Sequence, residues 1–321
     1  MTHMSTDNEP ASRKVGVLAY VLLLCMGVAW GLAISLSKIA AVSGGHPVTL
    51  GLWQVCVSGS LLFGIGLFWF RPSMPRPSVI SFSMFCGITG VSIPAMILFW
   101  CAIYLPAGIV AIAFASMPLF TYVLSVLFRV EQGNVIRFLG VVVGLAAMAL
   151  LILPDAALPS PDMVPWVLLA LLASVFMSAE NTYAGGMRPE GISSLQLSCG
   201  RQLGAIVFLT PIALLFADPI PVFEPWGRLQ WSATGAGILS GGAFTCLLYV
   251  IRTSGPVFAS QSAYIITLAG VAWGMVLFGE RHSVYIWAAL ALVLAGSALV
   301  TPRVPKLFRL FTQDTAQDNA E

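Results

Sequence analysis

Long apolar stretches, separated by short polar segments, dominate the chain. An α-helix needs about 20 apolar residues to cross the ~30 Å hydrocarbon core of a bilayer, and ten stretches of roughly that length are present. Charged residues, prolines and glycines interrupt the pattern between them, and no connection is long enough for a folded domain. The pattern therefore predicts ten membrane-spanning helices, at residues 17–41, 47–70, 79–103, 107–128, 135–153, 164–186, 192–217, 229–252, 256–278 and 283–301.

Composition narrows the class to an all-α integral membrane protein. Hydrophobic residues make up 58% of the 321 residues and charged residues only 9%, whereas soluble domains carry roughly 25% charged residues. The mean hydropathy is +0.92. Membrane lipid is therefore the expected surrounding of most of the chain. The net charge of +2 is too small to indicate a nucleic-acid partner, and we expect none.

The distribution of Lys and Arg predicts the orientation, because cytoplasmic loops carry an excess of both. If the chain starts in the cytoplasm, 11 of its 15 Lys and Arg residues lie on that side, whereas Arg228 and Arg281 lie outside and Lys38 and Arg201 lie within spans. This bias requires an even number of spans. We therefore predict a multi-pass protein of the cell (inner) membrane with cytoplasmic N- and C-termini. The 11 cytoplasmic residues are Arg13, Lys14, Arg71, Arg76, Arg129, Arg137, Arg188, Arg252, Arg303, Lys306 and Arg309.

The two halves of the chain are similar in sequence when one is shifted by 149 residues. Residues 105–153 then align with 254–302, so that Glu131 falls on Glu280. Each half holds five spans, and because five is odd the second copy crosses the membrane with the opposite topology. Inverted repeats are typical of secondary transporters, whose substrate site lies near the bilayer midplane between the repeats. The expected units are a cytoplasmic tail at 1–16, a first five-helix repeat at 17–153, an external linker at 154–163, a second repeat at 164–301 and a cytoplasmic tail at 302–321.

Three short motifs carry a family resemblance: AWG at 29–31, PLF at 118–120 and LFGE at 277–280. In this order they resemble the EamA-type transporters of the drug/metabolite transporter superfamily, over nearly all of residues 17–301. The resemblance implies a permease of two inverted repeats in which spans one, three, four, six, eight and nine surround a central cavity. It also implies transport of a small molecule, with export ahead of uptake. The chain departs from the family pattern at Gln54, where Arg is common, and at Glu131, where FRVEQ replaces the usual LGE.

Glu180 and Arg201 are the sharpest chemical signal, because a charge at the bilayer centre costs at least ~2.5–3.5 kcal/mol. At 1.5 Å per residue they lie about 9 Å and about 13 Å deep from the same side, on spans joined by a short loop. Two roles stand open. The two side chains form a structural intramembrane ion pair, or Glu180 takes up and releases a proton that is coupled to transport. Prolines inside spans predict kinked helices, at Pro94, Pro118 and Pro211.

Polar and aromatic residues at expected cavity positions make up the predicted substrate pathway. Aromatic rings line ligand pockets, and Ser35 and Asn181 add hydrogen-bonding groups to the first and sixth spans. The few deep charges favour a neutral or zwitterionic metabolite such as an amino acid, because a desolvated ionic group needs a partner. The pathway residues are Trp30, Ser35, Trp100, Ser116, Glu180, Asn181, Tyr249 and Tyr264.

Two other classes of protein stay open beside the carrier. A membrane scaffold or receptor could retain the carrier fold without transport. An intramembrane enzyme is the weakest alternative, because His3, His46 and His282 lie in tails or loops and no second acid lies deep in a span beside Glu180. The six cysteines lie in apolar stretches without CxxC spacing. We therefore expect no catalytic residue, no metal and no cofactor; the expected partners are a small-molecule substrate, lipid and a second copy in a homodimer.

Overall fold

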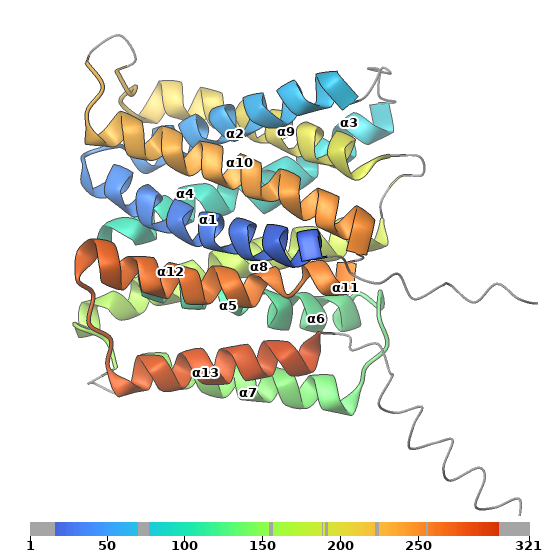
Figure 1. Cartoon of the computed structure of the whole chain (residues 1–321), viewed down its shortest axis with the longest axis vertical. Coiled ribbons are helices and arrows are strands. Elements are labelled where there is room, and N and C mark those ends of the chain that lie inside the picture. The colour runs from blue at the N-terminus through green and yellow to red at the C-terminus, as the bar shows by residue number, and fades with distance from the viewer. Residues whose placement is uncertain are drawn as a thin grey trace, which may run out of the picture.

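The described part of the chain is built of helices alone, as a computed structural model shows (Figure 1). It describes residues 17–69, 77–153, 157–187, 189, 192–221, 225–254 and 256–301. Both predicted tails fall outside these residues. The predicted fold class, an all-α membrane protein of ten spans, is confirmed. Eight of the spans are long and apolar enough to cross a bilayer, and the last two contain shorter apolar helices.

Several spans are made of more than one helix. The third joins α3 (Pro77–Gly87), the π-helix η1 (Ile88–Ser92) and α4 (Ile93–Tyr104), and the fourth joins α5 (Ala107–Ala115) and α6 (Met117–Leu127). A short 3₁₀-helix η2 (Pro161–Met163) precedes α8, and the ninth span joins α11 (Pro256–Ala259) and α12 (Ser262–Phe278). The remaining spans are α1 (Val17–Val42), α2 (Pro47–Trp69), α7 (Val135–Ile152), α8 (Val164–Gly186), α9 (Ser194–Phe216), α10 (Arg228–Ser254) and α13 (Val284–Val300).

Local sequence determines where the helices begin and end. Asn134 caps α7 through its side chain, and Ser193 forms a capping box with Gln196 at the start of α9. Gly279 ends α12 with a φ of 63°, a left-handed conformation that glycine adopts without steric cost. The predicted prolines act differently: Pro94 and Pro118 follow interruptions of spans three and four, whereas α9 continues through Pro211.

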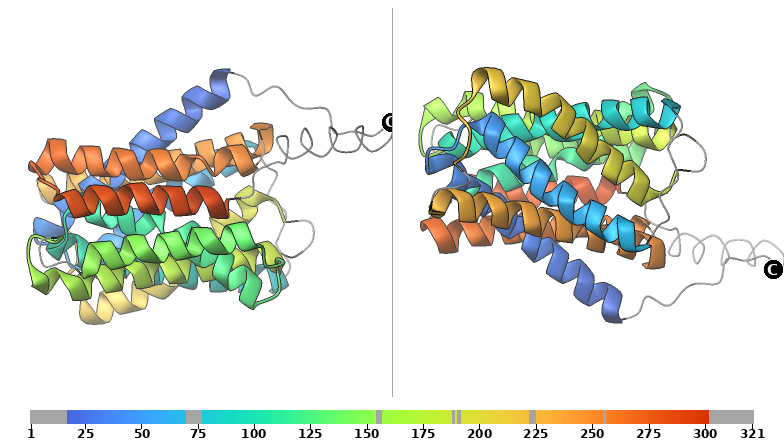
Figure 2. Two further views of the ribbon diagram at one scale, coloured as in Figure 1. Left: turned by 90° about the horizontal axis from the view of Figure 1, so that it is seen from below. Right: turned by 90° about the horizontal axis from the view of Figure 1, so that it is seen from above.

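The helices run roughly along one direction, so the bundle has two ends (Figures 1 and 2). We call the end where α1 begins and α13 finishes the terminal end, and the opposite one the distal end. Near the terminal end the first turns of α1 diverge from the bundle (Figure 2). There Val17 and Leu18 are largely exposed, as is expected of side chains that face lipid.

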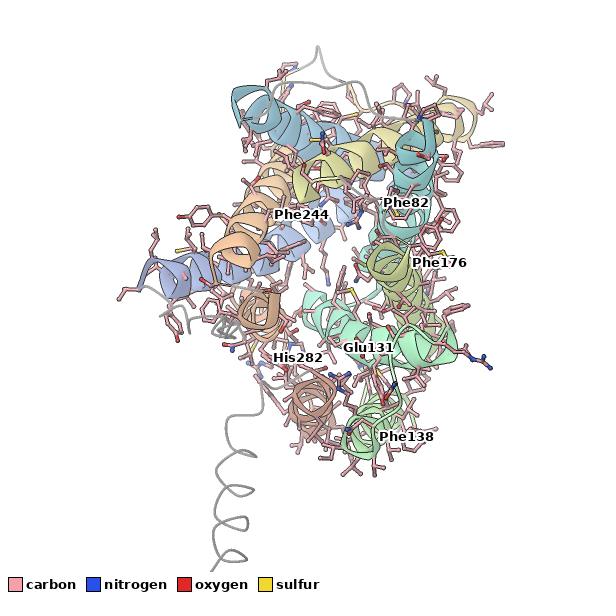
Figure 3. The ribbon with its side chains drawn as sticks, turned by 90° about the vertical axis from the view of Figure 1, so that its right-hand side faces the viewer. Phe82, Glu131, Phe138, Phe176, Phe244 and His282 are labelled. Atoms are coloured by element: carbon pink, nitrogen blue, oxygen red, sulfur yellow. The ribbon has the colours of Figure 1, made fainter. Side chains whose placement is uncertain are left out.

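Seen along its axis, the bundle has two sides (Figure 3). The α1 side consists of α1, α10, α11 and α12, and the α8 side consists of spans three and four together with α8. Outside them α2 packs against α9 and α10, and α13 packs against α7. The six spans of the two sides are those expected to surround the cavity. The inverted repeat exchanges the sides, since spans one, eight and nine correspond to six, three and four.

The two sides meet unequally at the two ends. At the distal end α5 packs directly against α12, and a Cβ on Gly270 would lie 2.6 Å from the Cβ of Ala111. Toward the terminal end α6 packs on α8 and α7, whereas α11 packs on α10. Spans four and nine therefore converge at the distal end and separate toward the terminal end.

Candidate functional site

Span four is interrupted at Ser116, between α5 and α6. Pro118 has no N–H to continue the helix, and the chain turns at Ser116 before α6 begins. The Ser116 hydroxyl donates to the carbonyl of Ala113, and the Ser297 hydroxyl from α13 donates to that of Ala115. In a membrane, backbone groups that a helix break frees are satisfied by such side chains. Breaks of this kind line the substrate sites of many transporters.

A ladder of hydroxyl groups joins α8 to span four along the same stretch. Ser174 and Ser178 each lie 2.9 Å from a span-four carbonyl, those of Ala113 and Met117. One turn further on, the Thr182 hydroxyl lies 3.4 Å from the carbonyl of Thr121. Side chains four residues apart lie on the same face of a helix, so Ser174, Ser178 and Thr182 meet successive turns of span four. The ladder ties α8 and span four together within the α8 side.

Glu180 and Arg201 lie on the α8 side, beside the π-helix of span three. Their carboxylate and guanidinium groups are 2.9 Å apart, and the side chain of Glu180 is 1% exposed. Gly90 of the π-helix makes this possible, since a Cβ there would lie 2.7 Å from Oε2 of Glu180. Besides Arg201, the thiol of Cys86 on α3 interacts with the Glu180 carboxylate. The pair is thus the carboxylate's principal interaction. Such π-turns often occur at functional sites.

A second charged cluster, which the sequence interpretation missed, lies at the distal end. The Lys38 Nζ is 3.2 Å from the Glu280 carboxylate and donates to the carbonyl of Leu105 at 2.8 Å. The same carboxylate accepts from the backbone N–H groups of Ala107 and Gly108, at 2.6 and 3.1 Å. Glu280 therefore caps the N-terminus of α5, where a negative charge is favoured.

The signal for this cluster was present in the sequence. Lys38 stands in the last two turns of its span, and Glu280 stands in the turn that the repeat aligned with Glu131. Both positions were expected at the same end of the bundle. The sequence does not show that α12 approaches the start of α5. This approach brings Glu280 into contact with Lys38.

The predicted pathway residues fall into three groups by burial in this conformation. Ser35 and Ser116 are fully buried, and the Ser35 hydroxyl has no hydrogen-bond partner among the described residues. Trp100 and Tyr249 are exposed, and Asn181 is exposed beside Met117 at the start of α6. Trp30 and Tyr264 are partly buried, Trp30 against Phe244 of α10 (labelled in Figure 3). The buried members can contact a solute only after the helices move.

Other chemistry is sparse in the described part of the chain. No group of three or more His, Cys, Asp or Glu residues is placed to hold a metal ion there. A shallow groove of about 370 Å³ lies between α6 and α7, lined by Tyr122, Asn134 and Phe138 among others. It is apolar and does not include either charged cluster. The region between the two sides remains the candidate site.

Comparison with known proteins agrees with this geometry. A model of the EamA-like transporter family matches residues 17–153 and again 164–301. The chain is 29% identical over 203 residues to the "Uncharacterized inner membrane transporter YedA" of Escherichia coli, and equally to the YedA of two further strains. These alignments cover 61% of this chain and 62% of each relative. A protein of known crystal structure shares the fold at a TM-score of 0.61 and 18% identity, covering 89% of this chain and 97% of that one.

Proposed function

Because this chain belongs to the EamA-like transporter family and is a multi-pass membrane transporter, we propose that it is a secondary carrier. The proposed carrier exports a small neutral or zwitterionic metabolite, such as an amino acid. The two sides of the bundle move against each other, so that the central site faces one compartment at a time. The single observation that carries this proposal is the contact between spans four and nine at the distal end and their separation toward the terminal end.

The proposed substrate class follows from how the charges within the described spans are used. Lys38 is held by Glu280 and Arg201 by Glu180. A strongly ionic substrate needs a free counter-charge when it leaves water, and these four groups already neutralise one another. Polar uncharged groups such as Asn181 and exposed rings such as Trp100 suit a neutral or zwitterionic solute instead.

Glu180 also carries a proposal about energy coupling. A buried carboxylate with one charged partner favours taking up a proton when that partner moves away. We therefore retain proton coupling as a role of Glu180, beside its structural pairing with Arg201. A homodimer stays a prediction.

Flux measurements on purified protein in liposomes test the carrier. Radiolabelled neutral amino acids loaded inside should exchange with external solute well above the rate of empty liposomes. Asn181→Leu should lower this flux several-fold, because it replaces an exposed polar group beside the span-four break. Gly242→Ala is the matched control, since a Cβ there meets nothing within 4 Å, and it should leave flux unchanged.

Two results would decide against the carrier. Stable protein that moves none of the solutes found by metabolite profiling of overexpressing and deletion strains would favour a scaffold or receptor. Chemical conversion of a solute without its movement would favour an enzyme.

A further inference from the structure

The charged cluster at the distal end joins the two sides of the bundle. Lys38 on α1 and Glu280 after α12 belong to the α1 side, whereas the turn from Leu105 to Gly108 belongs to the α8 side. Lys38 donates to the Leu105 carbonyl, and Glu280 accepts from the N–H groups of Ala107 and Gly108. Three hydrogen bonds with charged partners therefore hold one side to the other. Such bonds are roughly twice as strong as neutral ones.

The cluster is shielded from solvent. The side chains of Lys38 and Glu280 are 16% and 8% exposed, and His282 beside them is 2% exposed. Lys38 also lies 5.0 Å from the centre of the Phe278 ring, a favourable cation–π position. A Cβ on Gly108 would lie 2.7 Å from Nε2 of His282, so only glycine allows this approach. The distal contacts are thus formed in a largely dry environment.

The counterpart of Glu280 in the first repeat is not engaged in this way. Glu131 occupies the aligned turn at the terminal end, on the side nearer the viewer in Figure 3. Its carboxylate pairs with Arg137 of the adjacent α7 at 2.6 Å, and its side chain is 46% exposed. One Glu turn therefore bridges the two sides and the other bonds within its own repeat. This difference matches the closed distal end and the separation of spans four and nine toward the terminal end.

We infer that Lys38, Glu280 and the turn from Leu105 to Gly108 form a distal latch. In the closed state the latch holds the α1 side to the N-terminus of α5, and the distal end opens only when these contacts break. This inference rests on the proposed carrier function, since it assigns a task to Glu280 within the transport cycle. Glu280 acts here as a positioning residue, because it holds helices and does not touch the solute.

Thiol labelling tests the latch without any substrate. The reporter is a single cysteine, Ser35→Cys, in a background without other cysteines. Position 35 lies about one turn from Lys38 toward the terminal end and is buried when the latch is closed. A membrane-impermeant maleimide is applied to spheroplasts and to inside-out vesicles, so that the distal face is reached in one of the two. Glu280→Gln should raise the labelling rate from the distal face by about tenfold, since it weakens charge-assisted hydrogen bonds between the sides. Lys38→Met should act in the same direction.

The matched control is Glu131→Gln, which makes the same chemical change at the aligned turn and should leave distal labelling unchanged. The charge-reversed pair Lys38→Glu with Glu280→Lys should label as fast as Glu280→Gln. The backbone of the turn has fixed polarity, so the exchanged Glu meets a carbonyl and the exchanged Lys meets N–H donors.

The latch would be overturned if folded Glu280→Gln and Lys38→Met proteins label as slowly as the unmodified reporter protein. It would also be overturned if the charge-reversed pair labels that slowly. Size-exclusion profiles identify variants that fold. Absence of solute flux in the unmodified protein would count against the carrier alone, because the labelling rates remain readable without it.

Discussion

At the scale of single residues, Glu180 is the buried charge whose partner matters most. Its carboxylate is 1% exposed and depends on Arg201, and removing one member of a buried pair leaves the other charge unpaired. Glu180→Gln should therefore lower the free energy of unfolding by about 3 kcal/mol, measured as a loss of thermal stability in detergent. The double variant with Arg201→Gln should recover most of this loss through non-additive coupling.

The control for that experiment is Glu131→Gln, because the exposed pair with Arg137 should contribute less than about 1 kcal/mol. If Glu180→Gln is as stable as this control, the structural pair is refuted. If Glu180→Gln is stable and also loses only flux driven by a pH gradient, the proton-coupling role gains support.

We predict that His282 makes the distal end sensitive to pH. Burial lowers the pKa of its imidazole, the neighbouring Glu280 raises it to a lesser extent, and Lys38 lowers it further. The neutral form is therefore favoured while the end is closed, and the closed state loses stability as pH falls below the ordinary histidine pKa of about 6.5. Distal labelling at Ser35→Cys should rise between pH 7.5 and pH 5.5.

Maleimide reacts with the thiolate, whose population itself changes with pH. The labelling rate at position 35 is therefore divided by the rate of a cysteine at the largely exposed Val284. His282→Gln should remove the pH dependence without changing labelling at pH 7.5. A pH dependence that persists in His282→Gln would assign it to another group.

At the scale of the elements, the sequence predicted the spans and not their internal breaks. Apolar run length determines where a helix enters and leaves lipid, so each predicted span overlaps an observed one. The break at Ser116 had a local signal in Pro118. The turn at Ser260 and Gln261 between α11 and α12 has no proline, and its only signal is the short polar run from Ser260 to Ser262.

Part of the candidate site was likewise readable. Ser174, Ser178 and Thr182 recur every fourth residue, a pattern that places hydroxyls along one face of α8. Glu180 and Arg201 were found because charge is rare in lipid. The place of Ser35 and Ser116 in the interior could not be predicted, since it depends on which neighbouring helices cover them.

At the scale of the whole molecule, orientation is the prediction that sequence makes most directly. With the described ends of α1 and α13 together at the terminal end, the excess of Lys and Arg predicts that this end faces the cytoplasm. A reporter fused at Glu321 should be active in the cytoplasm, and one inserted at Pro159 should be active outside. Two reporters active on the same side would exclude the inverted arrangement.

The contact between α1, α5 and α12 also has an electrical consequence. Gly31 packs on Ala269 and Gly270 of α12, and Lys38 bonds to the Leu105 carbonyl before α5. The rise along α1 between these two residues is about 10 Å at 1.5 Å per residue, which is about a third of the ~30 Å hydrocarbon core. The membrane voltage falls mainly where water is excluded, so if water enters the carrier from the terminal end, most of the voltage falls across this layer in the closed state. A unit charge that crosses the full voltage changes energy by ~2.3 kcal/mol per 100 mV. Charges that shift within the layer, Lys38 and Glu280 above all, would make opening of the distal end depend on the voltage of the membrane.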